Sequence, residues 1–265
     1  MAKSFLKAVM KEKHKEVAQA QKRTPLDKLL QTVLTLPPVR NFREALANAP
    51  RINVVAEIKR RMPGSPSFRP RYGLEKMVAA YVAGGAVALS YVTDAKHFDG
   101  KLGQIAELKR LCGLPVLRKD FVVDPYQIYE SRAAQADAVL LIAEALPDKL
   151  LTRLVELTIG LGMTPVVEIH KAPDVKRSLR AGADVILINN RDLNTLKINR
   201  QTVGRLAKSI PRDNLVIAAS GYATPEEITT IESDRVRSVL VGRALLADSQ
   251  PETLLRRMVQ VAERL

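Results

Sequence analysis

The sequence has no tryptophan, one cysteine and few aromatic side chains. The single cysteine, Cys112, excludes an internal disulfide and any metal site built from several thiolates, so we expect a reducing, cytoplasmic location. Aromatic residues make up 4% of the chain, too few for the stacking surfaces of proteins that bind single-stranded nucleic acid. The three histidines, His14, His97 and His170, are widely separated, so we predict no metal site.

Long hydrophobic runs are also missing. The most apolar stretch, AVLLIAEAL, is too short to cross a bilayer and contains Glu144. The first residues, MAKSFLKAVMKEKHKEV, lack the continuous apolar segment of a signal peptide. We therefore expect neither export nor a membrane partner.

Acidic residues are outnumbered, with 28 Asp and Glu against 42 Lys and Arg, which gives a net charge of +14. Such an excess attracts anionic ligands and can support non-specific nucleic-acid binding. Because the basic residues are spread along the chain, we interpret the charge as a surface that favours a phosphorylated or carboxylated small molecule, with no nucleic-acid partner. A non-catalytic nucleic-acid binder is a hypothesis that rests on this charge alone.

Eight short apolar runs recur between Asn53 and Val241, with amphipathic stretches of helical spacing between them. The runs are continuous rather than alternating, as in strands covered on both faces of a parallel sheet. Eight alternating units predict an α/β fold, a closed (β/α)8 TIM barrel rather than an open doubly wound sheet. The runs are NVVAEI, AVALSYV, LPVLRKDF, ADAVLLI, TPVVEI, ADVILI, NLVIAAS and RSVLVG.

An internal repeat supports this count. Four pieces begin alike and lie about fifty residues apart, consistent with one copy for every two strand–helix units. We expect a single domain over residues 1–265, with an N-terminal helical extension at 1–50 and the barrel at 51–265. The extension is predicted to be a pair of helices that cap the barrel. The first has a basic outer face and an apolar stripe of Phe5, Leu6, Val9, Met10 and Val17.

Two opposite charges stand two positions apart at the end of the first run, Glu57 and Lys59. In a barrel strand alternate side chains face the interior, so both are expected to point toward the axis at the strand's carboxyl end. That end of the barrel carries the catalytic face. The alternative is a structural ion pair that closes the top of the barrel.

Further polar side chains follow other strands. Lys119 is expected at the end of the third strand, Glu168 at the end of the fifth and Asn189 at the end of the sixth, with Arg191 just after it. Two carboxylates, two ammonium groups, an amide and a guanidinium would then face one mouth, which suits acid/base chemistry on an anionic substrate.

A phosphate signal follows the last two strands, in ASGY and VGRAL. Each places a glycine, Gly221 or Gly242, where backbone N–H groups can approach an anion, the usual phosphate position of such barrels. Ser220 precedes the first glycine and Arg243 follows the second. Arg243 would either clamp the phosphate or pair with a surface carboxylate.

These blocks, in order and spacing, resemble indole-3-glycerol phosphate synthase, an enzyme of tryptophan biosynthesis. The matching pieces are AEIKR, LPVLRKDFVVDPYQIYESRAAQADAVLLI, VVEIH, ILINNRDL, ASG and VGRALL. The resemblance implies closure of an indole ring on a phosphorylated carboxyanilino-deoxyribulose, with loss of carbon dioxide and water and without a metal or organic cofactor. It leaves open a monomer or a weak homo-oligomer.

The resemblance also implies roles for residues. Lys119 would protonate the ketone oxygen during ring closure, and Lys59 would bind the substrate carboxylate. Glu57 and Glu168 would handle the protons of the dehydration. The other residues implied are Asn189 and Arg191 for orientation, Phe98 and Phe121 as apolar walls, and Ser220, Gly221, Gly242 and Arg243 for the phosphate.

Four positions depart from the family pattern. Met62 stands where the family has a serine, Ala219 where it has a glutamate, Arg243 where a small or acidic residue is common, and Gln135 where it has glycine. Three of these positions lie in or beside the expected pocket. A divergent or engineered barrel that acts on a different anionic small molecule is therefore the alternative hypothesis.

Overall fold

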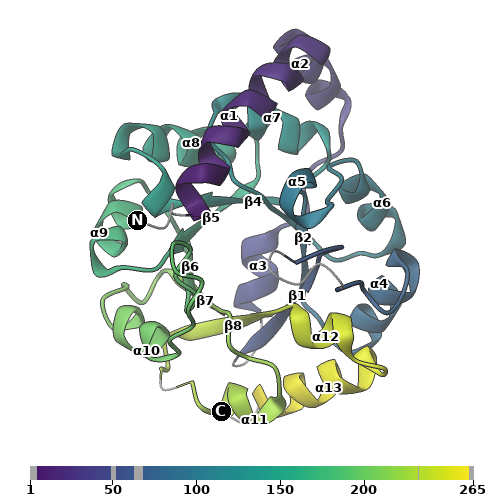
Figure 1. The fold of residues 1–265 in the computed structure, drawn as a ribbon, viewed down its shortest axis with the longest axis vertical. Coiled ribbons are helices and arrows are strands. Elements are labelled where there is room, and N and C mark those ends of the chain that lie inside the picture. The colour runs from purple at the N-terminus through teal and green to yellow at the C-terminus, as the bar shows by residue number, and fades with distance from the viewer. Residues whose placement is uncertain (1–4, 49–51, 63–67, 232, 263–265) are drawn as a thin grey trace.

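The computed structural model describes residues 5–48, 52–62, 68–231 and 233–262. Its centre is a closed barrel of eight strands, each hydrogen-bonded to its neighbours in chain order, with β1 also paired to β8 (Figure 1). All eight pairings are parallel, as the sequence predicted. The strands are β1 (Asn53–Ile58), β2 (Ala88–Val92), β3 (Val116–Lys119), β4 (Ala138–Ile142), β5 (Thr164–Ile169), β6 (Val185–Asn189), β7 (Leu215–Ala219) and β8 (Val236–Val241).

Eight helices follow the strands and form the outer ring (Figure 1). They are α4 (Leu74–Ala83), α6 (Gln104–Leu111), α7 (Pro125–Ala133), α8 (Asp148–Gly160), α9 (Ala172–Arg180), α10 (Gln201–Ala207), α11 (Pro225–Thr229) and α13 (Pro251–Ala262). Three short helical turns that the sequence did not reveal stand in the loops after strands: α5 (Ala95–Phe98), η1 (Ala143–Ala145) and α12 (Arg243–Ala247). None of the described helices is long and apolar enough to cross a membrane.

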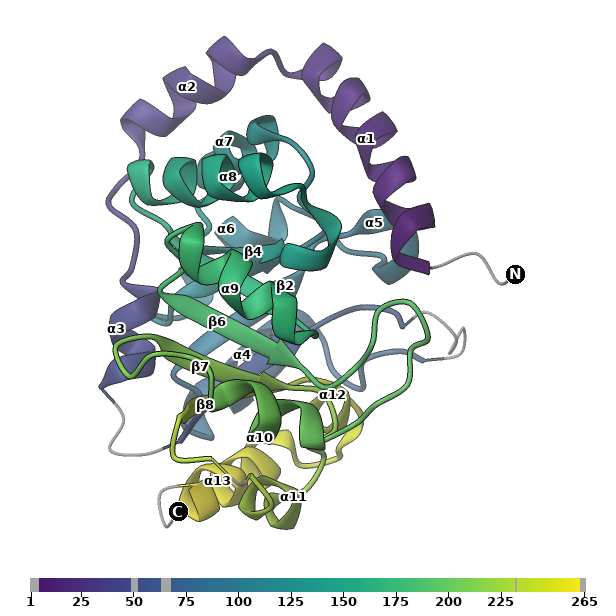
Figure 2. The same ribbon diagram turned by 90° about the vertical axis from the view of Figure 1, so that its left-hand side faces the viewer.

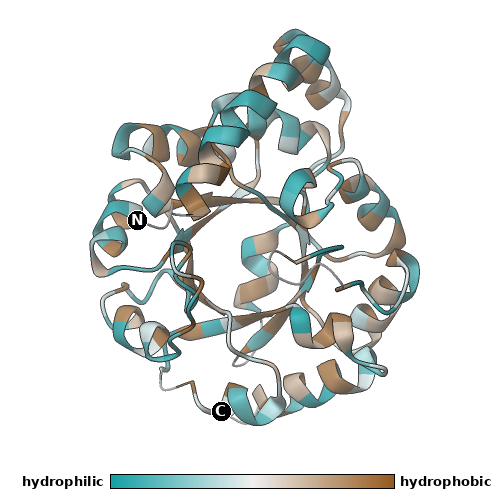
Figure 3. Ribbon diagram, viewed as in Figure 1, coloured by the Kyte–Doolittle hydropathy of each residue, from teal (hydrophilic) through white to brown (hydrophobic). Residues whose placement is uncertain are grey.

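The strands bury apolar side chains on both faces, which explains their continuous apolar runs. In β1, Val54, Ala56 and Ile58 pack under the helices, whereas Val55 belongs to the cluster inside the barrel. Figure 3 shows the strands as a largely hydrophobic ring and the outer helices as mixed. The same alternation directs Glu57, two residues after Val55, into the barrel.

Three helices precede the barrel: α1 (Phe5–Arg23), α2 (Leu26–Thr35) and α3 (Phe42–Ala47). The prediction that a pair of them caps the barrel is correct for α1, which lies over the rim beside α5, but wrong for α2, which packs on the outside against α7 (Figure 2). The opposite end is closed by α3, whose Phe42 and Leu46 are fully buried inside the barrel. The position of α2 follows from how its apolar surface is distributed, because Leu29 is the one residue of this helix that is buried.

Turns between helices and strands repeat along the chain. Gly85, Gly182 and Gln135 each follow a helix in the left-handed region, with φ of 90°, 82° and 68°. After each turn residue the next amide bonds back to the helix, as Ala136 N–H does to Ser131 O at 3.0 Å. Three of the four copies of the repeat seen in the sequence thus share a helix-ending turn, with glutamine in one of them.

Candidate active site

Glu57 and Lys59 face the barrel interior and its carboxyl-end rim as predicted. The Glu57 side chain is buried, Lys59 is slightly exposed, and Nζ of Lys59 lies 2.5 Å from Oε1 of Glu57. Glu57 on β1 is in register with Ser90 on β2, which fixes its position along the barrel axis. The two residues therefore form an ion pair whose ammonium group is the more accessible partner.

A second ion pair crosses the barrel from β3 to β5. Nζ of Lys119 lies 3.5 Å from Oε2 of Glu168, and the Lys119 side chain is 23% exposed while that of Glu168 is 3% exposed. Asn189, at the end of β6, donates its amide N–H to Oε1 of Glu168 at 2.9 Å. Lys119, Glu168 and Asn189, which end three different strands, thus converge.

Charge across the barrel shifts the pKa of one member of each pair, Glu57 and Lys119. Burial alone would raise the pKa of Glu57, but Lys59, Lys119 and Arg191 outweigh it and lower that pKa. Burial alone would lower the pKa of Lys119, but Glu168 and Glu57 outweigh it and raise that pKa. The site therefore holds a charged carboxylate and a charged ammonium group together at neutral pH.

Arg191 lies at the start of the loop after β6. Its backbone N–H donates to Oδ1 of Asn189 at 2.9 Å, and its guanidinium donates to the carbonyl of Leu196 at 2.9 Å. A single antiparallel bridge joins Arg191 to Ile198 and closes this loop into a hairpin. Burial and the nearby Arg243 guanidinium lower the pKa of Arg191. The positive charges of Arg191 and Arg243 repel each other, so an anion bound between them would be stabilised.

The residues of the expected phosphate site lie after β7 and β8. Ser220 and Gly221 are consecutive residues with positive φ, 68° and 92°. A Cβ on Gly221 would lie 3.2 Å from side-chain atoms of Arg200 and Ile198, so those side chains cover this turn. Gly242 is buried against Glu57, and Arg243 is exposed at the first position of α12.

Apolar side chains line the same end of the barrel interior. Phe121 is buried and Phe98 is partly buried, and both belong to the cluster that contains Leu140 and Ala219. Leu193, from the loop after β6, packs against this cluster. Ala219 is 3% exposed and stands in register with Asn189, so its methyl group occupies the place where the related pattern has a carboxylate.

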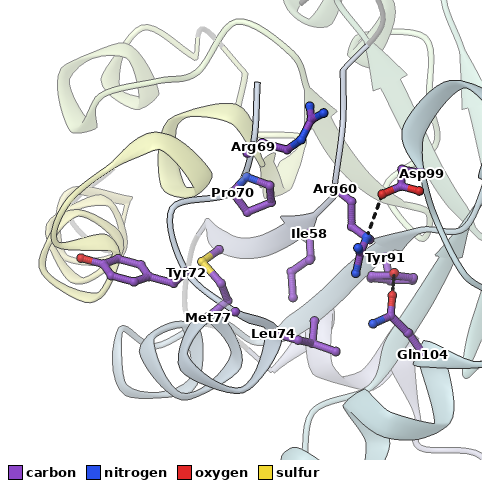
Figure 4. A pocket seen from close by; sticks show the side chains of 11 residues that line it. Ile58, Arg60, Arg69, Pro70, Tyr72, Leu74, Met77, Tyr91, Asp99 and Gln104 are labelled. Carbon is purple, nitrogen blue, oxygen red and sulfur yellow. Dashed lines mark hydrogen bonds and ion pairs between the residues drawn. The ribbon is translucent and has the colours of Figure 1, made fainter. Parts of the chain in front are cut away.

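A separate cavity of about 260 Å³ lies on the helix side of β1 and β2. Ile58, Met77 and Tyr91 line it, with Arg60 and Arg69 at its edge, and Arg60 is paired with Asp99 at 3.2 Å (Figure 4). None of the converging charged residues lines this cavity. Arg60, Arg61 and Met62 begin the loop after β1, and residues 63–67 of that loop lie outside the described part of the chain.

The histidines and the cysteine have other partners. His170 lies 2.7 Å from the carbonyl oxygen of Asn189, and His97 lies 3.1 Å from Asp94. Among the residues that the structure describes, no three His, Cys, Asp or Glu side chains gather as a metal site would require. Cys112 is partly buried and contacts the carbonyl of Leu108.

The sequence reasoning missed a second set of buried charges behind the site. The set is formed by Lys13, Asp94, Arg118 and Asp120, which are each at most 6% exposed and are joined by ion pairs. Lys13 departs from the basic outer face predicted for α1. The signal was available, because Lys13 lies four residues from both Val9 and Val17, on the apolar stripe of that helix.

The whole chain resembles one protein family. The family model described as indole-3-glycerol phosphate synthase matches residues 6–258. A protein of that name from Saccharopolyspora erythraea is 36% identical over 97% of this chain and 95% of its own length. Another from Desulforamulus reducens is 38% identical over 91% of this chain and 92% of its own length.

Solved structures share the fold at low sequence identity. The alpha subunit of tryptophan synthase from Legionella pneumophila superposes with a TM-score of 0.61 at 15% identity, covering 86% of this chain and all of that one. Thiamine phosphate pyrophosphorylase from Pyrococcus furiosus has a TM-score of 0.61 at 14% identity, covering 80% of this chain and 96% of that one. These likenesses concern the barrel alone.

Proposed function

Because the chain belongs to the indole-3-glycerol phosphate synthase family, we propose that it catalyses the family's ring closure. The substrate is 1-(2-carboxyphenylamino)-1-deoxyribulose 5-phosphate. It loses carbon dioxide and water and yields indole-3-glycerol phosphate. The reaction needs a proton donor for the ketone oxygen and a base for the dehydration, in a largely enclosed place.

The observation that carries the proposal is the pairing of Lys119 with Glu168 at 3.5 Å, beside Asn189. A protonated Lys119 can donate to the ketone oxygen as the aryl carbon attacks. Glu168 is held by Asn189 and is positioned to accept the proton lost in dehydration. Lys59, the accessible partner of Glu57, is suited to bind the substrate carboxylate.

The charge of the site suits this substrate. Lys59, Lys119, Arg191 and Arg243 contribute four positive charges and Glu57 and Glu168 two negative ones, which leaves +2. A phosphate carries roughly −1.5 to −2 at neutral pH, and the substrate carboxylate adds one more negative charge. We propose that Ser220, Gly221, Gly242 and Arg243 hold the phosphate, with Arg191 beside it.

The aromatic ring of the substrate requires an apolar surface next to these charges. Phe98 and Phe121 supply it in this proposal, because they belong to the apolar cluster at the same end of the barrel. Burial of an aryl ring against them stabilises the bound substrate and excludes water from the reacting carbon.

Turnover of the carboxyanilino sugar phosphate tests the proposal directly. Purified protein mixed with that substrate is expected to develop the fluorescence of an indole product. A protein that binds the non-reactive reduced analogue of the substrate but gives no indole signal at any enzyme concentration would contradict it.

A second candidate function, action on a different anionic small molecule, is favoured by Ala219 and Arg243. Relative to the family pattern, Ala219 removes a carboxylate from the barrel mouth and Arg243 adds a guanidinium near Arg191. Both changes make the mouth more positive. A substrate with a further negative charge would use that difference.

The setting of the enzyme is part of the proposal. We place it in the cytoplasm, as a monomer or a weak homo-oligomer, with a phosphorylated small molecule as its partner and no nucleic acid. Its single cysteine fits a reducing compartment.

A further inference from the structure

Lys13 is a buried lysine on a helix that precedes the barrel. It is 4% exposed, although it lies on α1, whose neighbouring residues Lys11 and Lys15 are exposed. Figures 1 and 2 show α1 lying across the carboxyl-end rim next to α5. A lysine in such a place is rare unless carboxylates surround its ammonium group.

Three carboxylates contact that ammonium group. Nζ of Lys13 lies 2.7 Å from Asp94, 3.1 Å from Asp120 and 2.7 Å from Glu16 of its own helix. Asp94 follows β2 and Asp120 follows β3, so a single side chain of the extension joins two loops of the catalytic face. Asp94 is fully buried and Asp120 is 6% exposed.

Each aspartate in turn fixes residues of the proposed site. Oδ1 of Asp94 accepts the backbone N–H of His97 at 2.8 Å and so caps α5, which carries Phe98. Oδ1 of Asp120 accepts the backbone N–H of Phe121 at 2.8 Å, and Asp120 directly follows Lys119. Lys13 and the two aspartates thus form a clamp. It lies one residue from Lys119, the proposed proton donor, and holds the proposed apolar walls Phe98 and Phe121.

Lys13 is the cation of this cluster that pairs with both Asp94 and Asp120. Arg118 pairs with Asp120 at 3.0 Å and with Glu130 at 2.9 Å, and Thr93 donates to Asp120 at 2.6 Å. Without Lys13, the side chain of Asp94 keeps, among the residues that the structure describes, the His97 ring and the His97 backbone amide as polar partners. A buried carboxylate left without its cation is strongly unfavourable, so the two loops would separate or admit water. The coupling also lowers the pKa of Asp120, since Arg118 and Lys13 outweigh its burial.

We propose that Lys13 is a positioning residue for the reaction, which sets Lys119 and Phe121 through Asp120 and sets Phe98 through Asp94. In this proposal the extension and the barrel act as one domain, and α1 contributes to the geometry of the catalytic face. The inference rests on the proposed function for its kinetic readout. Its structural readout is independent of that function.

The test compares three variants of the full-length chain. Lys13→Met keeps the length and apolar stem of the side chain but removes its charge. Lys15→Met removes an exposed lysine from the same helix. Val155→Ala opens a cavity under α8, away from the site, and controls for a general loss of stability.

We expect Lys13→Met to lower kcat at least tenfold, with a smaller rise in the Kd for the reduced substrate analogue because Phe98 and Phe121 line its aryl ring. Lys15→Met and Val155→Ala are expected to keep kcat within twofold. The proposal is overturned if Lys13→Met keeps its kcat, or if Val155→Ala loses as much.

A crystal structure of Lys13→Met decides the matter even if the wild-type protein makes no indole. We expect the 3.5 Å contact between Lys119 and Glu168 to lengthen and Phe121 to shift, and unchanged positions would contradict the inference.

If Lys13→Met does not fold, the double variant Lys13→Met/Asp94→Asn removes one buried charge of each sign. It should fold and still show the low kcat, because Asp120 remains unclamped; full kcat would overturn the proposal.

Discussion

Gly242 lies directly against Glu57, since a Cβ on Gly242 would come within 2.5 Å of Oε1 and 3.1 Å of Cβ of Glu57. The glycine after β8 therefore has a role that the phosphate pattern did not reveal. It leaves room for the carboxylate that pairs with Lys59. The end of β8 and the end of β1 are built to fit one another at this point.

Substitution of Gly242 should damage catalysis more than folding. In Gly242→Ala the Glu57 carboxylate must move, and a misplacement of about 1 Å in such a site can cost on the order of 100-fold in rate. We expect kcat to fall between about tenfold and 100-fold with a small change in melting temperature. The control is Gly103→Ala, because no atom lies within 4 Å of a Cβ at that position; equal loss in both variants would refute this reading.

The missing carboxylate at position 219 separates the two candidate functions. In Ala219→Glu a carboxylate would stand beside Asn189, and acid/base groups of this kind contribute on the order of 10² to 10⁴ in rate. If the chain makes indole-3-glycerol phosphate slowly for want of this group, turnover should rise at least about tenfold. Ala219→Gln controls for size, and no gain in Ala219→Glu would favour a different substrate.

The pH dependence of kcat/KM follows from the two shifted pKa values. Lys119 must be protonated, and its raised pKa keeps it so above its ordinary value of 10.5. Glu57 must be ionised, and its lowered pKa keeps it so below 4.5. We therefore expect a flat alkaline side through pH 9 and an acid limb near pH 6 that belongs to the substrate phosphate.

Glu168→Gln tests the cause of the alkaline behaviour. It removes the carboxylate that contributes most to raising the pKa of Lys119, so the alkaline limb of the residual activity should move to lower pH. An alkaline limb that stays in place would show that Lys119 is not the group that titrates.

Gln135 offers a stability prediction outside the site. Its backbone is left-handed at φ 68°, where Gly85 and Gly182 stand in the equivalent turns. A side chain in this region costs roughly 1–2 kcal/mol, and the greater freedom of glycine in the unfolded chain offsets about 0.5–1 kcal/mol of it. Gln135→Gly should thus raise the unfolding free energy by between about 0 and 1.5 kcal/mol.

Gly182→Ala is the matched control for that prediction. A Cβ there would lie 4.0 Å from the Val155 side chain, an ordinary van der Waals contact, so the backbone conformation is what opposes it. It should lose stability where Gln135→Gly gains it, measured by urea unfolding of both variants. A loss in Gln135→Gly would mean that the glutamine side chain makes a stabilising contact.

The barrel and most of its polar mouth could be predicted from the sequence because strand and helix periods are local. Glu57 and Lys59 share a face by spacing alone, and Lys119, Glu168 and Asn189 each lie near the end of a predicted strand. Their convergence was predictable once the runs were taken as parallel strands of one barrel. The partners within the mouth, Lys59 with Glu57 and Lys119 with Glu168, needed coordinates.

Contacts across long sequence distances were out of reach. Lys13 meets Asp94 and Asp120 only because α1 folds back over the rim, and no local pattern places that helix. The same holds for α2, whose position against α7 depends on which of two surfaces offers more apolar contact. Gly242 looked like an anion site by its place after β8, whereas its fit against Glu57 is a matter of packing.

The central claim is that Lys119 supplies the proton for ring closure, and Lys119→Met measures it most directly. The decisive quantity is kcat for indole-3-glycerol phosphate formation, with the Kd for the reduced analogue measured on the same preparation. The account predicts that kcat falls by about 10³-fold or more while the Kd changes by less than about tenfold. A Lys119→Met protein that binds the analogue and still turns over within tenfold of the wild type would contradict it.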